Sequence, residues 1–547
     1  MSAVREYDAV VVGAGFSGLY ALHRLRGLGL SVRVLEGGDG VGGTWYWNRY
    51  PGARCDIESV DYSYSFDEAL QQEWTWSERY PAQPELRRYL EHVADRFDLR
   101  RDIQLETWVT AARYEEGAGR WTLVTEGGER FSARWCVMAT GMLSAVNRPT
   151  FPGLGRFAGE WCHTARWPEE GMALAGRRVG IVGTGSTGIQ AATAIAREAG
   201  HLFVFQRTPN FSLPAQNRPL TDAEARAVKA RYPERRRQAR ESFIGVPSQP
   251  AEAAAVAVTP EERTSTFEER WQHGGLTFMS AFNDLIVNAE ANEHAAEFVR
   301  GKIRATVDDP AIAETLQPRG YAIGTKRLCV DTGYFEIFNR DNVTLVDVRA
   351  APIEEITPRG VRTADAEYEL DVLVFATGFD AMTGALLRID VRGRDGHALR
   401  DAWADGPQTY LGLATAGFPN LFIVTGPGSP SVLSNMVMSI EQHVEWIASC
   451  IAHLRASGVA TIEATPEAQD GWVAHVAEVA GLTLHGAADS WYNGANVPGK
   501  ARVYMPYIGG VGEYRKICER VAAAGYQGFA LEPAPADVAA DVAEAAA

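Results

Sequence analysis

The chain has 547 residues, enough for several domains, and its 46% hydrophobic and 22% charged residues are typical of a globular protein. Asp and Glu number 69 against 53 Lys and Arg, and the net charge of −16 argues against nucleic acid or an anionic membrane surface as the partner. No apolar run is long enough to span a bilayer and no secretory leader is recognisable, so we expect a cytoplasmic protein outside the membrane.

A βαβ unit is predicted near the start of the chain. A short β-prone run over 9–12 leads directly into the glycine-rich turn 13–18, followed by helically spaced apolar residues over 19–28 and a second strand over 31–35. In this context the glycines let the backbone approach a pyrophosphate, and the helix N-terminus offers it free N–H groups. The glycines expected to bind a first dinucleotide are Gly13, Gly15 and Gly18.

The same pattern recurs later in the chain. A strand over 179–182, the turn 183–188, a helix over 189–196 and a strand over 202–205 form a second βαβ unit. The glycines of its turn are Gly183, Gly185 and Gly188. Two such units predict two bound dinucleotides. The alternative for each unit is a purely structural role, without a ligand.

The second strands of the two units end in residues of opposite charge. Glu36 ends the first, and a carboxylate there accepts hydrogen bonds from a ribose diol and repels a 2′-phosphate. Arg207 and Thr208 end the second, and a guanidinium beside a hydroxyl binds phosphate. We therefore expect FAD or NAD in the first unit and NADP in the second, with a surface salt bridge as the alternative for Arg207. This pairing predicts hydride transfer from NADPH to a flavin.

An α-helical insertion is predicted to interrupt the second unit. Charged and Ala-rich stretches at helical spacing dominate between 213 and 322. Within them the basic run 235–237 is interleaved with acidic residues, which predicts a solvated helix face. Strands return over 343–348 and 370–377, and they are expected to complete the second sheet.

The sequence thus predicts an α/β protein with two Rossmann-like dinucleotide-binding domains and a helical insertion. The expected divisions are residues 1–145 and 380–530 for the FAD-binding domain, 146–213 and 326–379 for the NADP-binding domain, and 214–325 for the insertion. The segment 531–547 is rich in Ala, Pro and acidic residues and is predicted to be a disordered tail. Ala-Thr-Gly segments at 139–141 and 376–378 mark places where the chain would cross between the domains.

The six cysteines are scattered, at positions 55, 136, 162, 329, 450 and 518. Without a CxxC pair, a redox-active disulfide and a clustered zinc site are both disfavoured. We expect small core residues in a reducing compartment, and no bound metal.

A fingerprint precedes the second glycine-rich turn. Residues 157–168, Phe-Ala-Gly-Glu-Trp-Cys-His-Thr-Ala-Arg-Trp-Pro, match the FxGxxxHxxxW(P/D) pattern of Baeyer–Villiger monooxygenases, whose relatives that oxidise nitrogen and sulfur carry Tyr or Phe in place of Trp167. Segments 42–56, 324–327 and 491–500 also resemble that family. The resemblance extends over nearly the whole chain, to about residue 530. The pattern is most similar to the members that oxidise phenylacetone, with those acting on steroids and cyclohexanone nearby. For His163, on an expected interdomain linker, we predict a structural or conformational role.

The resemblance implies a reaction. NADPH reduces FAD, the flavin adds O₂, and the C4a-peroxyflavin anion attacks a ketone carbonyl to give an ester or lactone. Arg327 matches the catalytic arginine, and a permanently charged guanidinium stabilises the developing oxyanion. Asp56 matches the carboxylate that orients it. An ordinary ion pair and a turn-capping aspartate are the alternatives for these two residues.

Further cofactor residues are implied by position in the family's motifs. Those expected near FAD are Ser17 at the pyrophosphate, Val109 on the adenine side, and Thr44, Trp45, Tyr46, Trp47, Asp56 and Tyr62 at the flavin, with Met436 on the substrate loop beside it. Those expected near NADP are Arg54, Cys55, Asp56, Thr184, Ser186, Thr187, Ile189 and Gln190, Lys326 at the 2′-phosphate with Arg207 and Thr208, and Trp491 at the nicotinamide-side ribose. A solvated lysine, a core tryptophan and a core methionine are the alternatives for Lys326, Trp491 and Met436.

Two other functions compete with this one. The first is a flavin-dependent oxygenase of sulfur or nitrogen that uses the C4a-hydroperoxide; the second is a flavin- and NADPH-binding protein that senses redox state without turnover. The expected partners are O₂ and an aryl, linear or bulky ketone, in a monomer or small homo-oligomer.

Overall fold

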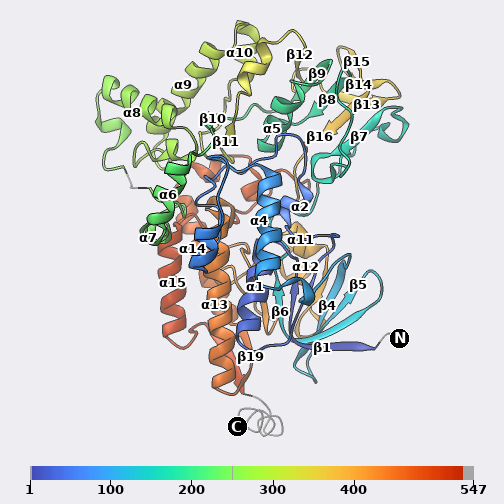
Figure 1. Cartoon of the computed structure of the whole chain (residues 1–547), viewed down its shortest axis with the longest axis vertical. Coiled ribbons are helices and arrows are strands. Elements are labelled where there is room, and N and C mark those ends of the chain that lie inside the picture. Colours follow the sequence, from blue (N-terminus) through green and yellow to red (C-terminus); the bar gives the residue numbers. More distant parts are fainter. Residues whose placement is uncertain (1–2, 249–250, 534–547) are drawn as a thin grey trace.

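The computed structural model describes residues 3–248 and 251–533 (Figure 1). Its largest sheet has the order β17-β4-β5-β6-β1-β2-β3, with β18 paired to β6. The strands are β1 Val4–Val12, β2 Val32–Leu35, β3 Ile103–Gln104, β4 Val109–Glu115, β5 Arg120–Thr125, β6 Arg130–Met138, β17 Asp390–Arg392 and β18 Leu421–Ile423. β1 pairs in parallel with β2 and β6, and its residues 9–12 are at most 7% exposed, as expected for a strand covered on both faces.

A second, all-parallel sheet has the order β12-β9-β8-β16-β7. Its strands are β7 Glu160–His163, β8 Arg178–Val182, β9 His201–Gln206, β12 Val343–Asp347 and β16 Val372–Phe375. Helix α1 (Phe16–Gly27) follows β1 and α5 (Ser186–Ile195) follows β8, so both predicted βαβ units are confirmed. In Figure 1 the second sheet lies above the first, and the α/β class with two Rossmann-type units is confirmed.

Helices fill the chain between β10 (Ser212–Pro214) and β11 (Cys329–Asp331), which pair with each other. They are α6 Asp222–Ala230, α7 Tyr232–Glu241, α8 Pro260–His273, α9 Ala289–Thr306 and α10 Pro310–Leu316, and α6 to α9 lie at the upper left of Figure 1. The other helices are α2 Thr44–Trp47, α3 Glu68–Glu73, α4 Gln83–Arg96, α11 Gly384–Leu387, α12 Leu399–Ala402, α13 Met436–Ala456, α14 Pro466–Gly481 and α15 Val511–Ala523. The exact domain boundaries stay a prediction.

Two small sheets complete the described chain, and one of them corrects the predicted tail. They are β13 Ile353–Thr357, β14 Gly360–Thr363 and β15 Glu367–Glu369, and β19 Val459–Ala464 with β20 Phe529–Pro533. Residues 531–533 belong to β20 and pair with β19, so the disordered tail was predicted to start too early. Pairing with β19, which is distant in the chain, orders these residues although the segment is rich in Ala, Pro and acidic residues. The rest of that segment, 534–547, lies outside the described residues.

The fingerprint is also more ordered than predicted. Residues 160–163 form β7, which pairs in parallel with β16 at the edge of the second sheet. The interpretation of the whole fingerprint as a linker was therefore wrong for these residues. All six cysteines are buried and unpaired, as small core residues. Within residues 3–248 and 251–533, no helix is long and apolar enough to cross a membrane.

Candidate active site

The two glycine-rich turns have nearly the same backbone. Gly13 and Gly183 have φ angles of +105° and +110°, and a Cβ on either would lie 2.6 or 2.5 Å from the carbonyl oxygen of Ala139 or Ala376. These alanines open the two Ala-Thr-Gly segments, so each segment packs directly under one turn. A Cβ on Gly18 would lie 1.8 Å from the Gly13 oxygen, which explains why the helix can start so close to the strand only with glycine at this position.

The strand ends keep the predicted difference in charge. Glu36 is 5% exposed, and its carboxylate accepts hydrogen bonds from the Ala14 and Gly38 N–H groups at 2.7 and 2.8 Å. Burial raises its pKa, and these backbone donors oppose that rise. Arg207, by contrast, is exposed and forms no ion pair among the described residues. Burial lowers the pKa of Lys326, and the nearby Arg207 charge lowers it too. Two cations therefore lie close together, as a phosphate site requires, while the charge of Asp489 opposes the fall in the pKa of Lys326.

The structure brings Arg327 and Asp56 into contact. The Nε and Nη2 atoms of Arg327 donate to Asp56 Oδ2 at 3.0 and 2.6 Å, and Nη1 donates to the Val432 carbonyl at 2.7 Å. The side chains are 22% and 21% exposed, so they are accessible but not fully hydrated. Burial opposes the charge of Arg327, but the attraction of Asp56 outweighs it and leaves the pKa of the guanidinium above its ordinary value. The result is a fixed, permanently charged donor.

Trp491 and Met436 lie in the same part of the molecule as this pair. Both pack against one apolar cluster that contains Val432 and Tyr492. Val432 is the residue whose carbonyl binds Arg327, and Tyr492 lies against its guanidinium. Sequence reasoning missed Tyr492, although it directly follows the predicted Trp491 in the motif segment.

Some of the residues predicted near FAD lie next to the first turn. Thr44 is exposed, Trp45 and Tyr46 are buried, and Trp47 lies under the Arg166 guanidinium at 4.2 Å. Tyr62 packs its ring on Phe16 and Trp45, with centroids 5.3 and 5.9 Å apart. Ser17 is buried in the first turn of α1, and Val109 is a buried residue that opens β4.

The residues predicted at NADP lie on α5 or on the segments next to it. Thr184 donates its hydroxyl to the Thr208 carbonyl at 2.9 Å, which ties the turn to the strand end. The Arg54 guanidinium pairs with Glu78 at 2.6 Å, and burial raises the pKa of the Cys55 thiol well above its usual value. The others in this group lie on the first turns of α5, namely Ser186, Thr187, Ile189 and Gln190. The contacts of these residues with a nucleotide stay a prediction.

His163 is enclosed in the fingerprint. It is 5% exposed, and its Nδ1 accepts a hydrogen bond from the Ala165 N–H at 3.1 Å. Burial and the charge of Arg166 lower its pKa to about 4, so it is neutral at physiological pH. Its ring lies 6.1 Å from that of Phe379, beside the second Ala-Thr-Gly segment.

The basic run of α7 is not a solvated face, which corrects the sequence interpretation. Arg235 binds the Asp61 carboxylate through two nitrogens at 2.7 and 2.6 Å. Arg236 is 3% exposed and donates to the Asp61 carbonyl and the Ser63 hydroxyl. Only Arg237 faces solvent, with acidic partners on its own helix. The helical spacing of Tyr232, Arg236 and Ala239 marks the buried face, a signal that the charge pattern hides.

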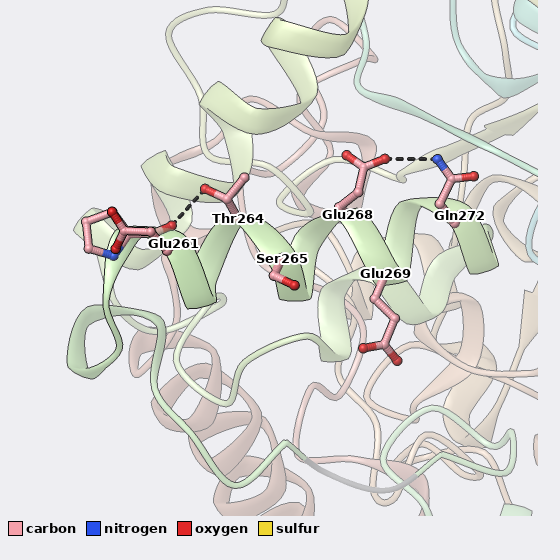
Figure 2. A pocket seen from close by; sticks show the side chains of 7 residues that line it. Glu261, Thr264, Ser265, Glu268, Glu269 and Gln272 are labelled. Atoms are coloured by element: carbon pink, nitrogen blue, oxygen red, sulfur yellow. Dashed lines mark hydrogen bonds between the residues drawn. The ribbon is translucent and has the colours of Figure 1, made fainter.

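A separate surface hollow runs along α8, and Figure 2 shows its polar side chains. Its lining includes Glu261, Glu268 and Glu269, and Glu268 is already paired with Lys302 at 2.6 Å. All of its lining residues belong to α8, and none of them is among those predicted for cofactor or substrate.

Comparisons with known proteins agree with the fold described above. A family described as flavin-binding monooxygenase-like matches residues 7–216. The acetone monooxygenase (methyl acetate-forming) of Gordonia sp. (strain TY-5) is 46% identical, over 96% of this chain and 99% of that protein. A phenazine N-monooxygenase of Lysobacter antibioticus is 43% identical, over 97% of this chain and 98% of that protein. The solved structure of an oxidized steroid monooxygenase bound to NADP is 54% identical, with a TM-score of 0.93, over 96% of this chain and 100% of that one.

These similarities extend over nearly the whole chain, and they coincide with an intact fingerprint that ends in Trp167 and Pro168. The chain belongs to the Baeyer–Villiger monooxygenases.

Proposed function

We propose that this protein is an FAD-containing, NADPH- and O₂-dependent monooxygenase that inserts oxygen next to a ketone carbonyl and forms an ester or lactone. The observation that carries the proposal is the Arg327 guanidinium, fixed by Asp56 and the Val432 carbonyl. When bound and reduced by NADPH, FAD supplies the activation of O₂. The chain's own residues then bind, orient and stabilise the reactants.

Arg327 stabilises negative charge on oxygen during the attack on the carbonyl. Its bonds to Asp56 and Val432 leave further N–H groups of the guanidinium free to donate. A unit-charge contact at about 4 Å contributes roughly 4 kcal/mol at an effective dielectric near 20. Asp56 holds the guanidinium in place and keeps it charged, so no reorientation is needed when the negative oxygen forms.

The remaining groups divide between the cofactors. Glu36 binds the ribose of FAD, with Gly13, Gly15, Ser17 and Gly18 at its pyrophosphate. Arg207, Thr208 and Lys326 bind the 2′-phosphate of NADPH, a role supported by the proximity of the two cations and by the exposure of Arg207, which forms no ion pair among the described residues. We propose the same division for the chain, with the FAD-binding, NADP-binding and helical parts bounded as predicted from the sequence.

The substrate is a ketone. The names of similar proteins point to acetone and steroids, and we propose aryl, linear or bulky ketones for this chain. The apolar cluster of Val432, Met436, Trp491 and Tyr492 beside Arg327 supports an apolar substituent next to the carbonyl. We expect the working enzyme to be a monomer or small homo-oligomer.

The decisive experiment is Arg327→Ala, assayed with NADPH, O₂ and a panel of ketones. We expect the variant to reduce its flavin with NADPH and to consume O₂, yet to form no ester or lactone, because the fixed cation is missing. Arg327→Lys is the matched control, since it keeps a charge but loses the fork that binds Asp56 and Val432. Ester formation by the alanine variant at the wild-type rate contradicts the proposal.

Oxygenation of nitrogen is a second candidate, favoured by one observation. The similar phenazine N-monooxygenase covers nearly the same length at an identity close to that of the acetone enzyme. Overall identity therefore does not separate the two chemistries, whereas a permanent cation favours an anionic oxygen nucleophile over a protonated, electrophilic one. Adding phenazine and a sulfide to the ketone panel distinguishes them: faster oxygenation of either than of every ketone favours this second function.

A further inference from the structure

Helix α5 contacts the chain segment that carries Asp56. The Gln190 amide oxygen accepts hydrogen bonds from the Tyr50 hydroxyl at 2.9 Å and from the Arg54 N–H at 3.3 Å. Its amide nitrogen donates to the Arg54 carbonyl at 3.0 Å. One side chain of α5 therefore binds both the N–H and the carbonyl group of Arg54, two residues before Asp56.

The backbone of α5 also rests on this segment. Gly52 has a φ of +81°, and a Cβ there would lie 2.6 Å from the Gln190 carbonyl oxygen. Tyr50 and Ala53 are buried in the apolar core of the second sheet, whereas Cys55 and Ile57 are buried in the core built on the first. The boundary between the two cores thus crosses the chain at Arg54, two residues before Asp56.

One turn nearer its N-terminus, and on the same face as Gln190, α5 contacts the segment that carries Arg327. The Ser186 hydroxyl lies 3.4 Å from Cys329 Sγ, and this sulfur faces the Arg327 carbonyl at 3.8 Å. Cys329 is 1% exposed and belongs to β11, which packs on α5. Both partners of the Asp56–Arg327 pair are therefore attached to the one helix whose N-terminus carries the second glycine-rich turn.

We propose that Gln190 and Ser186 are positioning residues that couple nucleotide binding at the second turn to the geometry of the Asp56–Arg327 pair. The inference rests on the proposed function, because that function places NADP(H) at residues 183–188. A nucleotide that orders the start of α5 thereby orders both segments that hold the pair. The cation is then in position when the nucleotide is bound, and less well positioned when it is absent.

Hydrogen–deuterium exchange of the FAD-loaded protein, with and without NADP⁺, tests this coupling without relying on turnover. In the wild type we expect NADP⁺ to slow exchange in 183–190 and also in 50–56 and 327–331. In Gln190→Met, which keeps the side-chain length but removes all three hydrogen bonds, we expect slowing at 183–188 to persist while that at 50–56 weakens by about 5-fold or more.

A matched control lies on the same helix. The Thr193 hydroxyl donates to the Ile189 carbonyl within α5 at 2.8 Å, and Thr193 is 4% exposed. Thr193→Val therefore changes a buried polar group of α5 without touching either segment, and we expect the wild-type exchange pattern. Tyr50→Phe removes a single bond to Gln190 with little change in shape, so it serves as a second variant and should weaken the slowing at 50–56 partly.

Turnover provides an independent measurement. We expect Gln190→Met to lower the ester formed per NADPH consumed by about 5-fold, with a smaller change in the KM for NADPH, because the misplaced cation lets reduced oxygen escape as peroxide. Two results overturn the inference: absence of slowing at 50–56 in the wild type, or a raised KM with unchanged exchange and unchanged ester yield. If the wild type forms no ester from any ketone, the proposed function fails, and the exchange result alone still decides the coupling.

Discussion

In the first glycine-rich turn Gly13 has a φ of +105° and packs under Ala139, and in the second Gly183 has a φ of +110° and packs under Ala376. The surroundings of the middle glycines differ. A Cβ on Gly15 would lie 3.3 Å from the Cα of Gly43, whereas a Cβ on Gly185 would meet nothing within 4 Å. The first turn is therefore closed over by its own chain, and the second is open.

The residues at the two strand ends also differ in exposure, one being buried and the other exposed. Glu36 is buried and satisfied by backbone N–H groups, whereas Arg207 is exposed and has no acidic partner within the described chain. An enclosed turn suits a cofactor that stays bound, and an open turn beside an exposed arginine suits one that exchanges in each cycle. Identical backbone geometry thus serves a resident FAD and an exchangeable NADP(H), and the distinction lies in the neighbours of the turn.

The largest effect is expected at the third glycines, where the two turns should behave alike. A Cβ would lie 1.8 Å from the Gly13 oxygen in Gly18→Ala and 2.0 Å from the Gly183 oxygen in Gly188→Ala. Backbone atoms must move in both, so we expect each variant to lose about 3 kcal/mol in free energy of unfolding. Urea unfolding followed by tryptophan fluorescence measures it. Wild-type stability in either variant breaks the equivalence of the two turns.

Buried histidines in the two halves give the next largest effect. Burial and a nearby arginine lower the pKa of His163, on β7, to about 4 and that of His443, on α13, to about 3. Because the unfolded chain takes up a proton near pH 6.5 and the folded protein does not, stability is retained above that pH and lost as the pH falls. We expect each buried histidine to lower the free energy of unfolding by about 2 kcal/mol as the pH falls from 6.5 to 5.

Urea unfolding across this pH range tests the histidines one at a time. His163→Gln and His443→Gln should each reduce the slope of the free energy of unfolding against pH by about 1.4 kcal/mol per pH unit, because one fewer proton is taken up on unfolding. An unchanged slope in both variants means that neither ring is neutral in the folded protein.

Arg207→Ala separates the two strand ends. Loss of an exposed phosphate contact should raise the KM for NADPH about tenfold and leave the KM for NADH nearly unchanged. Glu36→Gln is the matched change at the other turn, and it should weaken retention of FAD during gel filtration without altering the preference for NADPH. Equal effects of Arg207→Ala on both coenzymes contradict the assignment of the 2′-phosphate.

The sequence was sufficient for the local features of this comparison. Each glycine-rich turn sits between a β-prone run and a helical pattern, and that short-range order predicts the βαβ unit and the charge at its end. The pair of Asp56 and Arg327 was available only through the family's motifs, because no local pattern brings together residues so far apart in the chain.

The features that sequence reasoning missed depend on distant partners. Strand β7 is short and has no β-branched residue, and it forms because β16, far along the chain, supplies hydrogen bonds. Residues 531–533 are ordered by β19 in the same way. Arg236 is buried because Asp61 and Ser63 receive its N–H groups, and the acidic neighbours within α7 indicate nothing about them.

The smallest expected effect probes the openness of the second turn most directly. Gly185 has a φ of −78° and an extended ψ, which alanine adopts without strain, and its Cβ meets no atom. In the nucleotide-free protein the less flexible unfolded chain of Gly185→Ala should offset the loss of glycine at the N-cap of α5, so we expect the free energy of unfolding to change by less than about 0.5 kcal/mol. Gly15→Ala, also at an N-cap and crowded by Gly43, should lose more stability. Thermal unfolding of the two variants measures the difference.

Addition of NADP⁺ should then stabilise Gly185→Ala less than the wild type, because the added methyl occupies space that the pyrophosphate needs. Equal destabilisation of both nucleotide-free variants means that the second turn is as enclosed as the first, and the distinction between a resident and an exchanging cofactor then has to come from the charges of Glu36 and Arg207 alone.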